Sequence, residues 1–151
     1  MEIAQVETPV GWLVLREKDG ALVSLKWGKE KRDLGRPTPL LARATRQLKD
    51  YFAGKRHSFD LPLNPAGTAF QKRVWKSLVA IPYGETRPYG EVARLIKSAP
   101  RAVGMGCGKN PLPILIPCHR VVASNGALGG YSGGKGLETK AGLLELEQHR
   151  A

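Results

Sequence analysis

The sequence contains few cysteines, and both lie in its last third. Only Cys107 and Cys118 occur among 151 residues. Small secreted domains that depend on disulfides carry several spaced cysteines, so a disulfide framework of that kind is excluded. We therefore expect free thiols, a reducing compartment and a cytoplasmic location.

Long hydrophobic runs are also missing. No stretch of about 18 consecutive apolar residues occurs, although a membrane-spanning helix would need one. The first six residues contain no basic run followed by an apolar stretch, which a secretory signal would show. The sequence therefore predicts a soluble protein with no membrane partner.

Acidic residues are scarce relative to basic ones. The chain carries 24 Lys and Arg against 13 Asp and Glu, a net charge of +11. Such a field concentrates polyanions, and phosphate neutralisation supplies most of nonspecific nucleic-acid binding. A basic surface that serves only solubility explains the charge about equally well.

The first sixty residues have the pattern of a small antiparallel sheet followed by a helix. Apolar, β-favouring runs at 3–6, 12–15 and 22–27 are separated by turn-forming residues, and Asp19-Gly20 is a hairpin signal. Apolar positions within 40–52 have helical spacing, and Gly54 follows them. Pro62 and Pro65 indicate a linker. We expect domains at 1–63 and 64–151.

The second half predicts helices. Thr68 and Gln71 form a capping-box pattern before a helix that ends near residue 81 and has Val79 on its apolar face. A second helix is expected to cover 89–96. Ser98 is expected to cap a third helix, with Pro100 in its first turn. Two short helices and a tight turn fit a helix-turn-helix, although a helical pair that serves only packing fits equally well.

The third predicted helix is rich in small residues. Glycine costs about 1 kcal/mol per position inside a helix, so a close approach to another surface is expected. That surface is either a groove of DNA or a neighbouring helix. The small residues are Ala102, Gly104, Gly106 and Gly108.

Cys118 is the candidate nucleophile. Three prolines surround the apolar triplet 114–116, which predicts a rigid, buried, extended segment that ends at Cys118. The neighbouring His119 could accept the thiol proton and lower the Cys118 pKa. A merely buried structural cysteine is the alternative. Zinc is disfavoured, because Cys107, Cys118 and His119 supply at most three ligands and a structural site needs four.

The segment 116–121 resembles the active-site signature of the O6-alkylguanine-DNA alkyltransferases, also called methylated-DNA–protein-cysteine methyltransferases. Similar motifs, in the same order, extend this resemblance over residues 67–147. They lie at 67–71, 74–75, 81–86, 101–104, 110–111 and 129–134. The resemblance implies an α+β protein: an N-terminal sheet with a helix in a ribonuclease H-like outline, and a mainly helical C-terminal domain with a winged-helix-like helix-turn-helix.

The resemblance also implies the roles of the catalytic residues. Cys118 would accept the alkyl group, and Asn110 would brace the active-site turn. His119, a bridging water and Glu147 would form a proton relay, with Glu145 as a nearby competitor for the carboxylate role.

For DNA, the resemblance implies that Arg101 fills the gap left by an extruded base and that Tyr89 crowds the phosphate and bonds the flipped guanine. Ala102 and Gly106 would let the helix backbone approach the duplex. The pocket would be formed by the backbone carbonyls of Cys118 and Val121, the Ser132 amide and the Tyr131 ring.

The implied reaction is irreversible and occurs once per molecule, with transfer from O6 of guanine in double-stranded DNA and activity on O4 of thymine left open. We expect no cofactor and no metal, and a monomer for which cooperative binding on DNA is left open. Cys107 and Gly130 depart from the pattern of many relatives. A DNA-binding module without catalysis and a cysteine hydrolase are the alternative functions.

Overall fold

The computed structural model describes the backbone of residues 2–150 and the side chains of residues 2–148. The chain forms two compact units, of which one ends at Ala66 and the other begins at Gly67. The prolines of the linker had placed this boundary at residue 64. The protein is of the α+β class, as expected, and the two units are described separately.

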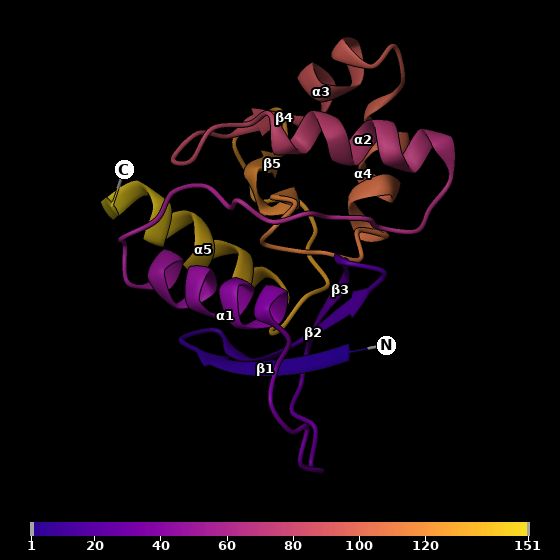
Figure 1. Ribbon diagram of the computed structural model, residues 1–151. Helices are drawn as coiled ribbons and strands as arrows, with labels where there is room; N and C mark the ends of the chain where they lie inside the picture. Colours follow the sequence, from indigo (N-terminus) through magenta and orange to yellow (C-terminus); the bar gives the residue numbers. More distant parts are fainter. Residues whose placement is uncertain (1, 151) are drawn as a thin grey trace. The chain divides into compact units, whose positions relative to one another are not determined.

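The first unit contains a three-stranded antiparallel sheet in the order β1-β2-β3 (Figure 1). The strands are β1 (Glu2–Thr8), β2 (Gly11–Lys18) and β3 (Ala21–Trp27). Val6 pairs with Leu13, and Leu15 pairs with Leu25; all four side chains are buried. The predicted hairpin is confirmed, because Asp19 and Gly20 both have positive φ, as a two-residue type I′ turn requires.

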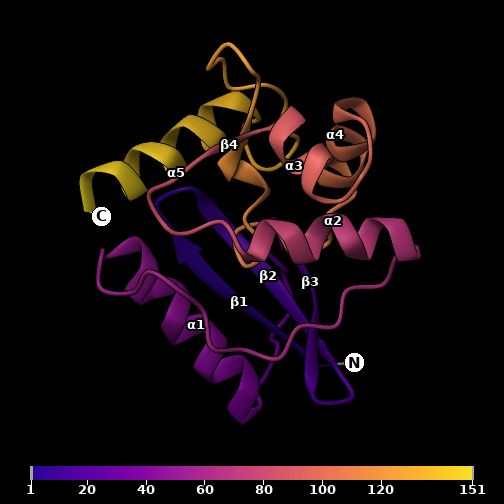
Figure 2. The ribbon, with the colours of Figure 1, turned by 90° about the horizontal axis from the view of Figure 1, so that it is seen from above.

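Helix α1 (Pro39–Phe52) contacts β1 and β2 and runs beside the sheet (Figure 2). The Thr38 side chain caps its first turn by accepting a hydrogen bond from the Leu41 amide at 3.1 Å. Gly54, at a φ of 77°, follows its end, as predicted. The buried face includes Gln47, whose amide group is satisfied by both backbone atoms of Asp60 at 3.0 and 3.3 Å.

As far as the structure describes it, the second unit contains four α-helices, a short 3-10 helix and a short parallel pair of strands. Helices α2 (Ala69–Val79), α3 (Tyr89–Leu95) and α4 (Pro100–Gly108) contact one another (Figure 2), and α5 (Leu137–Arg150) closes the chain. Strands β4 (Arg87–Pro88) and β5 (Val121–Val122) pair in parallel. The capping box at Thr68 is confirmed.

Two local predictions in this unit are wrong. Val79 was expected on the apolar face of α2, but it is 56% exposed, because the helix ends there. Ser98 was expected to cap α4, but the cap position is Ala99. The Ser98 amide instead bonds to the Ala93 carbonyl at 2.8 Å, with Lys97 at a positive φ of 57°, and this closes the end of α3.

The small residues of α4 meet a neighbouring helix at Gly106. A Cβ atom there would lie 3.0–3.2 Å from the side-chain carbons of Val74 on α2. The Trp75 indole donates a hydrogen bond to the Gly106 carbonyl at 2.9 Å. Gly106 is therefore buried against α2, and its size serves helix packing.

In the part of the chain that the structure describes, none of the helices has the length and apolar character needed to cross a lipid bilayer.

Candidate active site and nucleic-acid interface

The segment before Cys118 is a compact turn, and the expected extended strand is wrong. Ile114 has a φ of 74°, in the left-handed region, and the Ile116 amide bonds back to the Leu112 carbonyl at 2.8 Å. Pro117, with φ −80° and ψ 65°, forms an inverse γ-turn in which the Cys118 amide bonds to the Ile116 carbonyl. Cys118 therefore begins a short 3-10 helix, Cys118–Arg120, at the end of a folded loop.

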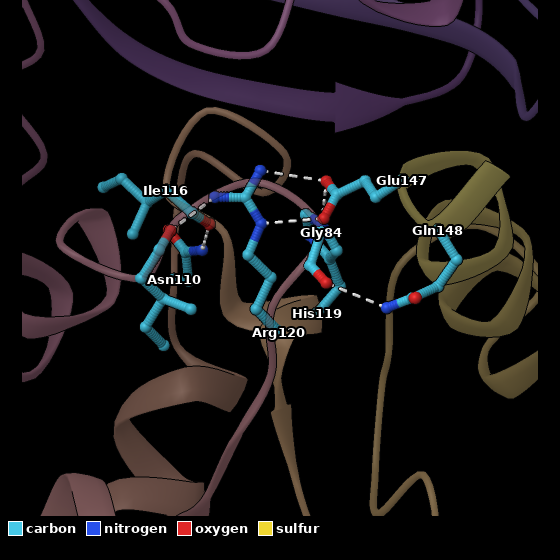
Figure 3. Close-up of polar contacts among 8 residues, drawn as sticks. Gly84, Asn110, Ile116, His119, Arg120, Glu147 and Gln148 are labelled. Atoms are coloured by element: carbon cyan, nitrogen blue, oxygen red, sulfur yellow. Dashed lines mark hydrogen bonds and ion pairs between the residues drawn. The ribbon is translucent and has the colours of Figure 1, made fainter. Parts of the chain in front are cut away.

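Asn110 explains why this loop folds on itself. Its side-chain NH2 donates to the Ile116 carbonyl at 2.8 Å (Figure 3). Its side-chain oxygen accepts from the Leu112 amide at 2.9 Å. One amide group thus replaces the backbone partners that a strand would have provided. Asn110 also makes a side-chain hydrogen bond that favours the thiolate of Cys118.

The Cys118 thiol is buried, and burial dominates its titration. Loss of solvation raises the pKa of Cys118 above its ordinary value, and the hydrogen bond from Asn110 and the charge of Lys140 oppose this rise. The expectation that His119 lowers the Cys118 pKa is therefore wrong for this structure. A buried neutral thiol needs a base to become nucleophilic.

A buried ionic network lies beside Cys118 in the sequence and is completed by α5. The Nε2 atom of His119 lies 2.8 Å from Oε2 of Glu147. Arg120 donates to both carboxylate oxygens of Glu147, at 2.8 and 3.0 Å (Figure 3). Arg120 also donates to the Ile81 carbonyl at 2.7 Å. Glu147 is 1% exposed, whereas Glu145 lies on the exposed side of α5.

This network determines which His119 nitrogen can act as a base. A carboxylate that pairs with Arg120 accepts hydrogen bonds, so Nε2 of His119 carries the proton. Burial lowers the pKa of His119 below its ordinary value, although Glu147 opposes this, so the ring is neutral near pH 7. Its Nδ1 atom is buried and has no hydrogen-bond partner among the residues that the structure describes. The orphaned atom is thus an unprotonated nitrogen that can accept a proton.

Lys140 is a buried cation near Cys118 that no pattern in the sequence indicated. It is fully buried on α5, and its ammonium group donates to the carbonyls of Val121, Leu128 and Gly130. It also lies 5.8 Å from the centre of the Tyr89 ring. Burial lowers the pKa of Lys140, and the two thiols, Cys118 and Cys107, oppose this. A lysine in a polar terminal helix gave no sequence signal of burial.

Tyr89 and Tyr131 gather near the same thiols. Burial raises the pKa of both tyrosines, and Cys118 raises both further. Burial and Cys118 also raise the pKa of Cys107 to about 12. Tyr89 is in tight contact with Gly129, where an added Cβ atom would lie 2.9 Å from the tyrosine ring. Neutral phenols therefore lie at the same site as the Cys118 thiol.

Comparison with known proteins identifies the family. Residues 3–65 match the ribonuclease-like domain of 6-O-methylguanine DNA methyltransferase, and residues 69–149 match its DNA-binding domain. The chain is 44% identical to the constitutive methylated-DNA–protein-cysteine methyltransferase of Bacillus subtilis, over 94% of this chain and 92% of the relative. The chain belongs to the 6-O-methylguanine DNA methyltransferase family.

Solved members of this methyltransferase family have the same fold. The Mycobacterium tuberculosis protein in complex with DNA superposes with a TM-score of 0.88 at 43% identity, covering 100% of this chain and 95% of that one. The O6-methylguanine DNA methyltransferase of Methanococcus jannaschii gives a TM-score of 0.72 at 33% identity, covering 97% of this chain and 92% of that one.

The residues expected to contact DNA differ in their exposure to solvent. Arg101 is exposed in the first turn of α4, and Ala102 beside it is partly exposed. Gly106 is buried against Val74, so it does not face solvent. Ser132 is exposed next to Tyr131.

The Val121 carbonyl, expected in the pocket, accepts a hydrogen bond from Lys140 at 2.7 Å. Arg120, which the sequence analysis noted only within the signature, is the main partner of Glu147. Among the described side chains, no three His, Cys, Asp or Glu residues gather in a group that could hold a metal ion.

Proposed function

We propose that this chain repairs DNA by direct reversal, as a methylated-DNA–protein-cysteine methyltransferase that takes a methyl or larger alkyl group from O6 of guanine onto Cys118. One observation carries this assignment: Cys118 is followed directly by a buried histidine whose Nε2 is held by Glu147 and whose Nδ1 has no hydrogen-bond partner within the described part of the chain. A cysteine that only filled the core would not require this arrangement.

The proposed reaction is a displacement at the alkyl carbon. The Cys118 thiolate attacks that carbon, the carbon–O6 bond breaks, and its electron pair stays on the guanine. The guanine takes up one proton, which balances the proton that the Cys118 thiol gives up, and a thioether remains on the protein. Water does not readily hydrolyse a thioether, so each molecule repairs one base.

His119 supplies the base in this proposal. Because burial disfavours the Cys118 thiolate, the thiol proton must have an acceptor as the sulfur attacks. The His119 Nδ1 atom receives it through a bridging water, and the imidazolium that forms is stabilised by Glu147. Arg120 acts through Glu147 and is a positioning residue, because its two hydrogen bonds fix the carboxylate.

Tyr89 is the proposed hydrogen-bond donor to the flipped guanine. The raised pKa of Tyr89 keeps its phenol protonated near neutral pH, so the phenol can donate as negative charge develops on the base. Tyr131, Ser132 and the carbonyls of Cys118 and Val121 complete the proposed pocket. Lys140 supports it by tying Val121 to the 128–130 segment.

The guanine must leave the duplex, because O6 is inaccessible within the base stack. Arg101, exposed on α4, is proposed to fill the vacated space, while Ala102 allows the helix to approach the duplex. We further propose that the protein acts in the cytoplasm as a monomer, with double-stranded DNA as its partner and no metal or other cofactor.

Titration against duplex oligonucleotide containing O6-methylguanine tests the function. We expect the repaired guanine to plateau at one equivalent per protein, and Cys118→Ser to bind the duplex without repairing it. Many turnovers per molecule would indicate a hydrolase or another catalyst. Binding without repair by the parent protein would indicate a DNA-binding module that does not transfer the group.

A further inference from the structure

Helix α4 exposes one large apolar side chain. Met105 is 67% exposed, whereas Val103 and Gly106, on the opposite side of the helix, are buried. Residues four positions apart lie on the same face of a helix. Met105 therefore stands one turn beyond the exposed Arg101, on the side that points away from α2.

The stretch of chain that carries Met105 is cationic, and the space beside it is open. The chain has no Asp or Glu between residues 92 and 137, while Lys97, Arg101 and Lys109 are exposed there. A Cβ atom added at Gly108 would meet no atom of the described residues within 4 Å, so these residues leave the adjacent space open. This charge is complementary to a polyphosphate and repels basic surfaces.

We propose that Met105 is an apolar wedge that enters the base stack of duplex DNA beside Arg101. The inference rests on the proposed function. Four residues of helix span about 6 Å, and successive bases of one strand are about 3.4 Å apart. Met105 therefore reaches the base stack within about two base steps of the position occupied by Arg101.

The chemistry of methionine suits this position. Its side chain is flexible and polarisable, and apolar side chains inserted between base steps partly unstack them. Arg101 supplies charge and hydrogen bonds to the opened site, whereas Met105 supplies apolar contact with exposed base faces. Met105 thus favours the flipped state of the lesion and contributes little to the affinity for undamaged duplex.

Single-turnover rates with two substrates test the wedge. In Met105→Ala, we expect the rate with O6-methylguanine in duplex DNA to fall about tenfold, because part of a methionine side chain loses its apolar contacts. The rate with free O6-benzylguanine should stay unchanged, since a free base requires no flipping. Met105→Leu should retain most of the duplex rate. Val79→Ala, which shortens another exposed apolar side chain, is the matched control and should react like the parent.

A second measurement reports on stacking directly. In the Cys118→Ser background, 2-aminopurine placed next to O6-methylguanine should brighten when protein binds, and Met105→Ala should reduce this increase. Met105→Lys tests whether charge alone explains the effect. We expect this variant to repair duplex DNA more slowly than the parent, and a duplex rate equal to that of the parent would overturn the proposal.

Equal duplex rates for the parent and Met105→Ala would overturn the wedge proposal and leave the proposed function standing. Equal losses with both substrates would show damage to the pocket and would also overturn the wedge proposal. A parent protein that repairs neither substrate would instead overturn the proposed function together with this inference.

Discussion

At the scale of single residues, the buried network of His119, Arg120 and Glu147 is the most consequential feature. Removing one partner of a buried ion pair leaves an uncompensated charge. Here Glu147 lies 28 residues after His119 and 27 residues after Arg120 in the sequence. The network therefore links the folding of α5 to the protonation state of the proposed base.

The titration of His119 predicts how stability depends on pH. Its pKa in the folded protein lies below the ordinary value near 6.5, so below that pH the unfolded chain binds a proton that the folded chain excludes. The contribution of His119 to the free energy of unfolding is therefore fully present above about pH 6.5. As the pH drops below that value, this group lowers the free energy of unfolding by at most about 1.4 kcal/mol per pH unit. Urea unfolding at pH 7.5, 6.5 and 5.5 measures this.

His119→Gln is the control for that experiment. Glutamine keeps a donor for Glu147 but does not titrate. The decline in stability between pH 6.5 and 5.5 should be shallower in the variant than in the parent. Identical pH profiles would contradict a neutral, buried His119.

At the scale of elements, the packing of α4 on α2 gives a sharp prediction. Gly106→Ala would place a Cβ atom 3.0–3.2 Å from Val74, so we expect a loss of about 1–3 kcal/mol from overpacking. Gly108→Ala in the same helix meets nothing within 4 Å and should leave stability unchanged or raise it slightly. Denaturant unfolding compares the two.

Val74→Ala tests whether the contact causes that loss. Shortening Val74 makes room for the new methyl group, so the double variant should lose less stability than the sum of the two single variants. Strict additivity would show that the cause lies elsewhere.

The exposed first turn of α4 supports a prediction about base flipping. Arg101→Ala should slow repair of O6-methylguanine in duplex DNA far more than reaction with free O6-benzylguanine, because only the duplex reaction requires the vacated position to be filled. Stopped-flow rates for variant and parent provide the comparison. Unchanged rates with both substrates would show that Arg101 is a solvated surface residue.

The elements also show what the sequence could predict. The strands of the first unit and the Asp19-Gly20 turn follow from alternation and local turn chemistry, so they were predictable. The turn at Ile114 was not, because one side chain, Asn110, replaces the backbone partners of a strand. Lys140 and Arg120 were missed because their acceptors lie far away in sequence, and helical periodicity cannot show that a cation points inward.

At the scale of the whole molecule, the net charge of +11 predicts salt-sensitive binding. Lys and Arg release condensed counterions from DNA when they neutralise phosphates, so affinity should fall about tenfold or more between about 50 and 200 mM salt. Fluorescence anisotropy with Cys118→Ser and a labelled duplex measures this without repair. An affinity independent of salt would contradict electrostatic docking.

The central claim is that Cys118 itself receives the alkyl group. Trypsin cleaves after Arg101, Lys109 and Arg120, so the two cysteines fall in separate peptides, 102–109 and 110–120. After reaction with O6-methylguanine duplex, mass spectrometry should show the 110–120 peptide heavier by one CH2 group, in proportion to the guanine repaired, and the 102–109 peptide unchanged. A methyl group found only on Cys107, or repair with neither peptide modified, would contradict the account.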